Sequence, residues 1–266
     1  DTIDAGAGDD RVAFAAAALD NLDTVAGGDG EDTIAFADAD DATALDATAH
    51  TAFEILELGT AGVGGNTFDN ADFAFTKIVL AGDVVGLTVD NLDAGTIEVQ
   101  DNQTAAIAVT SVGDEDTLGL TINAEAATTI AALDVTGVET VNVTTTADTD
   151  DTTFTAIETD GVSALSFAGA GDIIITDITD ADATNDATVK IANIDLTGQT
   201  GGFEMTANNL GYGTTFTLAD LGATASANYD LDGDATNDEA SELFGTLGFT
   251  DTFVFTTAFT GNVVID

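Results

Sequence analysis

The chain has 266 residues, of which 49 are Asp or Glu and only three are Lys or Arg, so its formal net charge is −46. Nucleic acid and anionic lipid are excluded as partners, because the chain has no basic patch to meet phosphate groups. The absence of Cys excludes disulfides and thiolate chemistry, and no apolar run is long enough to span a bilayer. Hydrophobic residues make up 44% of the chain, which is enough for a core if cations or salt offset the self-repulsion.

A glycine-rich nonapeptide near the N-terminus is the most specific motif. Residues Gly27–Ala35 fit the pattern Gly-Gly-x-Gly-x-Asp-x-U-x, where U is a large apolar residue, at every specified position. The pattern predicts a tight glycine turn followed by a short strand, with Ile34 pointing into a core. Backbone carbonyls in the turn and the carboxylate of Asp32 would form an oxygen cage of the kind that suits Ca²⁺. The alternative is a glycine turn whose Asp only faces water.

Two further copies of this pattern precede it. Residues Asp1–Asp4 resemble the tail of one copy, and Ala5–Ala13 form another in which only the first Gly is replaced. Asp1 and Asp10 are one nonapeptide apart, whereas Asp10 and Asp32 are 22 residues apart, which predicts one longer coil between two stacked turns. The candidate ligands for Ca²⁺ in these turns are Asp1, Gly6, Gly8, Asp10, Gly27, Gly28, Asp29, Gly30 and Asp32.

These turns resemble the calcium-binding repeats of RTX proteins, which bacteria export by type I secretion. The resemblance implies a parallel β-roll, Ca²⁺ as the bound ion and an extracellular location at the cell surface. It covers roughly the first 35 residues.

The sequence pattern changes after the glycine repeats. Short apolar alternations begin at residues 78, 87, 97, 107, 118, 130 and 141, separated by Gly, Asp and Asn. Strands this short at so regular a spacing predict an all-β chain of stacked parallel coils, a β-solenoid or β-roll. The alternative is a set of β-sandwich modules, in part of the chain or throughout. We divide the chain into repeats at 1–50, a Thr- and Val-rich solenoid at 51–206 and a looser β segment at 207–266.

A second, more diffuse resemblance lies in this middle region. Residues Gly137–Thr144 read Gly-Val-Glu-Thr-Val-Asn-Val-Thr, and Ala52–Leu58 form a looser version. Together with the Thr-rich strands they resemble surface-layer proteins of Gram-negative bacteria that carry RTX repeats, of the Caulobacter type. The resemblance implies a structural subunit that assembles with like subunits into a lattice or filament, with cell-surface polysaccharide as a further candidate partner.

A second candidate calcium loop lies near the C-terminus. Acidic residues alternate over Tyr229–Glu239, which is similar to an EF-hand loop, although its Gly and its closing Glu do not stand at the expected positions. An acidic surface loop is the alternative. The candidate ligands here are Asp230, Asp232, Asp234 and Asp238.

Catalysis has little support in the sequence. The single His, His50, lies in a polar stretch and is expected to be an ordinary surface residue, and no nucleophile elbow is present. We therefore expect a non-enzymatic surface protein, either a surface-layer or a filament subunit. The alternatives are the RTX region of a secreted adhesin and the non-catalytic repeat tail of a secreted hydrolase.

Overall fold

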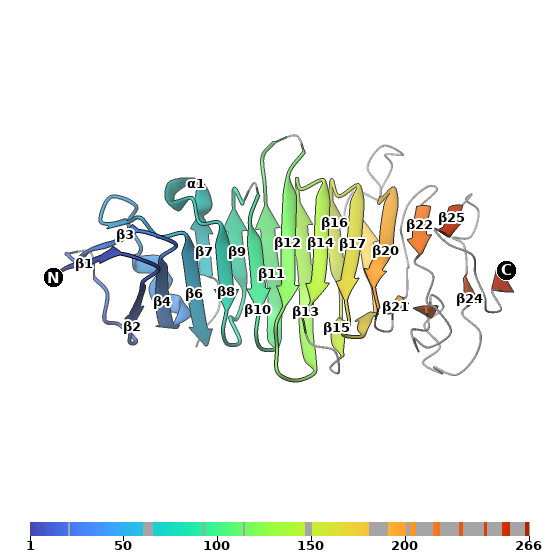
Figure 1. The fold of residues 1–266 in the computed structure, drawn as a ribbon, viewed down its shortest axis with the longest axis horizontal. Helices are drawn as coiled ribbons and strands as arrows, with labels where there is room; N and C mark the ends of the chain where they lie inside the picture. Colours follow the sequence, from blue (N-terminus) through green and yellow to red (C-terminus); the bar gives the residue numbers. More distant parts are fainter. Residues whose placement is uncertain are drawn as a thin grey trace.

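The computed structural model describes residues 1–20, 22–60, 66–92, 94–113, 115–146, 151–180, 191–200 and 203–205. It also describes the strand backbones at 215–218, 229–230, 242–243, 252–255 and 264–265. Every strand pairing in these residues is parallel. The chain is a parallel β-solenoid, as the sequence predicts, and its strands lie side by side along the long axis of Figure 1. The described part contains no antiparallel hairpin of the kind that builds a sandwich.

The longest sheet, here called the long sheet, extends through most of the chain. Its order is β2 (Arg11–Phe14), β4 (Thr33–Asp38), β6 (Ile55–Thr60), β8 (Lys77–Leu80), β10 (Thr96–Val99), β12 (Thr117–Ile122), β14 (Thr140–Thr145), β17 (Ala164–Gly169), β20 (Asn193–Gln199), β22 (Thr215–Leu218) and β25 (Thr252–Phe255).

The strands that alternate with these along the chain form two other sheets. The N-terminal sheet contains β1 (Thr2–Ala7), β3 (Thr24–Asp29) and β5 (His50–Thr51). The opposite sheet contains β7 (Asn66–Asp69), β9 (Leu87–Asp90), β11 (Gln103–Thr110), β13 (Thr128–Thr136), β15 (Thr152–Phe154), β16 (Ile157–Asp160), β18 (Ile173–Ile175), β19 (Ile178–Asp180), β21 (Phe203–Met205) and β23 (Tyr229–Asp230).

Two short helices and one further strand pair lie outside these sheets in the described residues. The helices are a 3₁₀-helix, η1 (Ala39–Ala44), and the single turn α1 (Asn70–Phe73), and β24 (Glu242–Leu243) pairs with β26 (Val264–Ile265). No helix among the described residues has both the length and the apolar character needed to cross a membrane.

Alternating side chains place one continuous core between the long sheet and the opposite sheet. In β14, for example, Val141 and Val143 are buried while Thr140, Asn142 and Thr144 face outward. Parallel register pairs Val141 with Leu118 and Leu165. Corresponding positions of these neighbouring coils therefore carry apolar side chains of similar size. Burial of these rows supplies the main stabilisation of the fold.

The short apolar segments of the sequence are strands, but consecutive segments do not pair with each other. Ile97 pairs with Ile78 and Leu120 within the long sheet, whereas the intervening segment at Ile107 pairs with Leu87 and Leu133 in the opposite sheet. One coil of the solenoid is therefore two segments long. The alternation follows from the short turns between segments, which carry the chain from one face of the core to the other.

Candidate metal site

Three turns stack on one another at the N-terminal corner of the long sheet. The backbone N–H of Asp10 donates to Oδ1 of Asp32 at 2.8 Å, and the N–H of Asp32 donates in turn to Oε2 of Glu54 at 2.8 Å. Each pair is separated by 22 residues. The predicted stacking of Asp10 on Asp32 is thus present, and Glu54 continues the column in the next coil.

Asp32 is the most unusual residue of this column because it is fully buried. Its Oδ1 atom caps the coil that precedes it, but its Oδ2 atom is buried without a hydrogen-bond partner. A buried carboxylate oxygen without a partner costs free energy, since it has given up its bonds to water. The fold therefore holds an acceptor at this point that only a further ligand would satisfy.

Gly27 packs closely against that oxygen. A Cβ atom added to Gly27 would lie 1.9 Å from the carbonyl oxygen of Ala52, 2.6 Å from Cβ of Asp32 and 2.8 Å from Oδ2 of Asp32. Because residue 27 has no side chain, the carboxylate of Asp32 and the carbonyl of Ala52 can both pack against it. The two oxygens are at most about 5 Å apart, a separation that fits two ligands of one Ca²⁺ at 2.3–2.6 Å each.

Gly28 lacks a side chain for a similar reason. Its φ is 118°, and an added Cβ would lie 1.8 Å from the carbonyl oxygen of Gly6 in the preceding coil. Gly28 of β3 pairs with Gly6 of β1, and the two strands can approach this closely here only because residue 28 is Gly. The first two glycines of the motif thus both allow close packing, of Asp32 and Ala52 against Gly27 and of Gly6 against Gly28.

The donor set suits a hard cation with oxygen ligands. Asp32 and the Ala52 carbonyl would hold the ion, with backbone carbonyls as the remaining protein ligands. No three Asp, Glu or His side chains gather around one point in the described residues. A site at this corner would accordingly depend on the backbone, and the Asp32 carboxylate would supply most of its negative charge.

The structure does not bring the other predicted ligands of the repeats together at one point. Asp10 is half-buried in the same column, and its Oδ2 atom also has no hydrogen-bond partner. Asp1 does not join it, because the Asp1 carbonyl accepts from Thr24 at the start of the N-terminal sheet. Asp29 is exposed, and its carbonyl accepts from Gly8. Gly6, Gly8 and Gly30 all have positive φ; Gly6 lies in β1, whereas Gly8 and Gly30 lie in the turns that follow β1 and β3.

Sequence reasoning missed Ala52 and Glu54 as parts of this corner. Ala52 has a φ of 57°, which is uncommon for a residue with a side chain, and it follows Gly30 by the same interval that separates Asp32 from Glu54. That repeated interval was the available signal. It was obscured because neither residue matches the glycine nonapeptide.

The Gly-Val-Glu-Thr motif forms a comparable corner further along. Glu139 accepts from the N–H of Asp116 at 2.7 Å, as Glu54 does from Asp32. Here, however, Oδ2 of Asp116 accepts from the hydroxyl of Ser111 at 2.6 Å. The protein itself satisfies Oδ2 of the Asp at this corner, whereas nothing in the described residues does so for Oδ2 of Asp32. The Glu of this motif therefore links one coil to the next.

His50 is buried, and the prediction that it is an ordinary surface residue is wrong. It is 4% exposed, its Nδ1 atom accepts from the N–H of Asp46, and its Nε2 atom is buried without a hydrogen-bond partner. Burial lowers the pKa of the His50 imidazole, although Asp46 and Asp23 oppose the shift. His50 lies in β5 and pairs with Val25 of β3, and this place in the stacked strands removes its ring from water.

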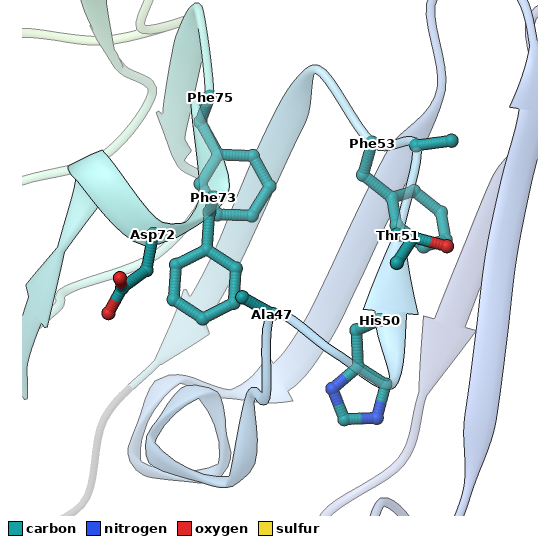
Figure 2. Close-up of a pocket in the computed structure, with 8 residues that line it drawn as sticks. Ala47, His50, Thr51, Phe53, Asp72, Phe73 and Phe75 are labelled. Atoms are coloured by element: carbon teal, nitrogen blue, oxygen red, sulfur yellow. The ribbon is translucent and has the colours of Figure 1, made fainter.

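A small cavity of about 150 Å³ adjoins His50 (Figure 2). The rings of Phe73 and Phe75 are stacked 5.5 Å apart on one side, and Phe53 lies on another. The carboxylate of Asp72 points away from these rings in Figure 2. His50 and Asp72 are the two titratable groups of the lining, and their arrangement offers no positioned acid–base pair.

The second predicted calcium loop lies almost wholly outside the described residues. Asp230 ends the two-residue strand β23, which pairs with β21. Asp232, Asp234 and Asp238 are not among the described residues. Calcium binding there stays a prediction.

Glu98 carries the clearest pH dependence in the middle of the solenoid. It is 7% exposed and forms an ion pair with Lys77. Burial alone would raise the pKa of Glu98, but hydrogen bonds from Lys77, Asn123 and Gln100 together hold the pKa below its usual value of 4.5. Because the folded-state pKa is depressed, the stabilisation is complete above about pH 4.5 and is lost as the pH falls through the folded-state value.

We expect Glu98→Gln to remove this dependence. At pH 7 the variant should be less stable by about 1.5 kcal/mol, because a charged acceptor of hydrogen bonds is lost. Below pH 4.5 the difference from the wild type should shrink. Thermal unfolding of both proteins between pH 3 and 7 measures this difference in stability. A difference that is constant with pH would contradict the assignment of the pH dependence to Glu98.

Comparison of the chain with models of known protein families, with curated proteins and with solved structures found no match. The fold defines the class: an all-β protein built as a parallel β-solenoid.

Proposed function

We propose that this chain belongs to a structural protein of the bacterial cell surface, and that its N-terminal coils bind Ca²⁺. The observation that carries the calcium part is the fully buried Asp32, whose Oδ2 atom lacks a hydrogen-bond partner and lies close to Gly27 and to the carbonyl oxygen of Ala52. A divalent cation there would pair the carboxylate and complete the coordination that the turn carbonyls begin.

The charge of the chain supports the same conclusion. At −46, the compact solenoid brings many carboxylates together, and self-repulsion opposes folding. A cation that binds the folded coils and not the unfolded chain stabilises them by mass action, by about 2.7 kcal/mol when its concentration is a hundred times Kd. In a compartment with little calcium the repeats would stay loose, and outside the cell they would fold.

The shape of the molecule favours a structural role over a catalytic one. Stacked coils give an elongated body (Figure 1), and solenoids of this kind use their extended surfaces for binding. The partners we propose are like subunits in a lattice or filament. Cell-surface polysaccharide is a further candidate partner, and type I secretion is the route that the RTX-like repeats imply.

Removal of calcium tests the proposal. In 1 mM Ca²⁺ we expect strand content by circular dichroism, a cooperative thermal transition and ordered assemblies by electron microscopy. A chelator at the same low ionic strength should lower the transition temperature and disperse the assemblies, and added Ca²⁺ should restore both.

Matched additions of Na⁺ and Mg²⁺ are the controls for simple screening. If the chelated protein at low salt keeps the same transition and the same assemblies, the calcium proposal is wrong. If Na⁺ at equal ionic strength restores the protein as well as Ca²⁺ does, screening and not a specific site is responsible.

A further inference from the structure

We propose that two copies of this chain associate through the outer face of the long sheet. We call this surface the neutral face and define it by the outward side chains of β2, β4, β6, β8, β10, β12, β14, β17 and β20. The proposal deepens the assembly role proposed above and rests on it, but it does not require calcium binding.

The neutral face is almost without net charge on a molecule that carries −46. Its charged residues are two cations and three carboxylates. The remaining outward residues of these strands are Thr, Ser, Asn, Ala, Gly, Val and Ile. The charged residues are Arg11, Lys77, Glu57, Glu98 and Asp195.

Both cations are paired within the face. The guanidinium of Arg11 donates to both carboxylate oxygens of Glu57, at 2.7 and 2.9 Å, and the pair spans the intervening coil above Ala35, which is 2% exposed. Lys77 pairs with Glu98 on adjacent coils. These pairs hold the long side chains close to the sheet, so that the surface is flat as well as neutral.

The opposite sheet has a different outer surface. Its outward charged residues in β7, β9, β13 and β16 are all carboxylates, and no Lys or Arg accompanies them in these strands. Burial, with the charge of Glu158 adding to it, raises the pKa of Asp134. If two copies approached each other through this surface, their carboxylates would repel one another. The residues are Asp69, Asp90, Asp134, Glu158 and Asp160.

Charge therefore selects the occupant of the neutral face. Two chains of −46 repel each other at every acidic surface, and contact through a surface without net charge minimises that repulsion. Contact of the face with its own copy is a two-fold arrangement in which the same patch serves both partners. Phe36 and Phe167 are buried in the core and Phe14 packs half-buried against it, so the outward side chains of the face offer a sugar no aromatic stacking platform.

The area is adequate for such a contact. Nine strands about 4.8 Å apart, each with about five residues at 3.3 Å, span roughly 40 by 16 Å, or about 650 Å² of flat surface. A standard interface buries about 800 Å² of accessible surface on each partner, and accessible surface exceeds the flat area beneath it.

Added charge on matched positions of the two sheets tests the proposal. Thr121 and Thr144 pair in register on adjacent coils of the neutral face, and Thr88 and Ala108 do so on the opposite sheet. The double variant Thr121→Asp/Thr144→Asp should weaken self-association at least tenfold by sedimentation velocity in 0.15 M salt. The control Thr88→Asp/Ala108→Asp adds the same charge and should change the dissociation constant less than twofold.

Thiol protection gives a second readout that tolerates a loss of stability in the Asp variants. Because the chain has no Cys, the single variant Thr144→Cys should react slowly with a thiol reagent at concentrations where the dimer forms, and the control Thr88→Cys should react as fast as in the monomer. Equal effects of both pairs of variants, or a wild type that stays monomeric at every concentration tested, would overturn the proposal. So would binding of a soluble polysaccharide by the wild type that blocks dimer formation and is lost in Thr121→Asp/Thr144→Asp.

Calorimetric titration of the same proteins with Ca²⁺ separates this proposal from the calcium proposal. All variants keep residues 1–54 unchanged and should bind Ca²⁺ as the wild type does. If Ca²⁺ does not bind but dimers form and depend on the neutral face, the calcium proposal alone fails. If Ca²⁺ binds but the dimer does not depend on the neutral face, this inference alone fails.

Discussion

Asp32→Asn should reduce the stability of the N-terminal coils in calcium and leave it unchanged or higher in chelator. The amide oxygen of Asn can still accept from the N–H of Asp10, so the link between coils is kept. What is lost is the charge on Oδ2, the buried oxygen without a partner. In Ca²⁺ at a hundred times Kd the loss should reach about 2.7 kcal/mol, whereas without Ca²⁺ the variant no longer buries an unpaired charge.

Hydrogen exchange with and without Ca²⁺ measures this effect locally. Protection in residues 1–54 should fall in the calcium-loaded variant, while residues 117–180 should keep theirs, because coils of a solenoid contact only their neighbours. The control is Asp4→Asn, which removes an exposed carboxylate from the neighbouring strand β1. An equal loss of stability with and without Ca²⁺ would show that Asp32 has only a structural role.

Phe154→Ala should produce the largest loss in the middle of the solenoid, about 3–5 kcal/mol. Phe154 is fully buried in β15, and register places it between Ile130 and Ile175 of the adjacent coils. Its removal leaves a cavity that the two neighbouring strands cannot close without breaking their own hydrogen bonds. The loss should be the same in Ca²⁺ and in chelator.

Thr153→Ala is the matched control, since Thr153 precedes Phe154 and faces outward. It should change the stability by less than about 0.5 kcal/mol. Urea unfolding with hydrogen exchange distinguishes a local opening of residues 128–178 from global unfolding. A loss below about 1 kcal/mol for Phe154→Ala would mean that this row of side chains does not support the fold as the register suggests.

The N-terminal column shows which contacts the spacing of residues in the sequence can predict. The interval between Asp10 and Asp32 predicted that their turns stack, and the structure places them in hydrogen-bond contact. The same interval leads to Glu54, but its coil lacks the glycine pattern and adopts the needed backbone with Ala52 at a φ of 57°. Tertiary stacking held Ala in a conformation that local preference disfavours, which is why a motif search passed over it.

Other features had no local signal at all. His50 lies in a polar stretch, and its burial depends on the pairing of β5 with β3. The pairing of Arg11 with Glu57 depends on two coils of register and on a small residue, Ala35, between them. Charge composition pointed to cations, but which face of the molecule is neutral depends on where each strand lies in a sheet.

The predicted glycine turn is shorter in the structure, because Gly27 and Gly28 lie in β3. The sequence predicts a parallel β-solenoid of short strands with apolar rows inside, and the structure confirms this fold over the alternative of β-sandwich modules. These properties follow from side-chain alternation, glycine conformations and a short repeat interval, all of which are local. Three features depend on the tertiary structure: consecutive segments lie in different sheets, Asp32 is buried beside Gly27 and Ala52, and the long sheet presents a neutral face. The reason is physical, because register between parallel strands about twenty residues apart is set by the packing of whole coils.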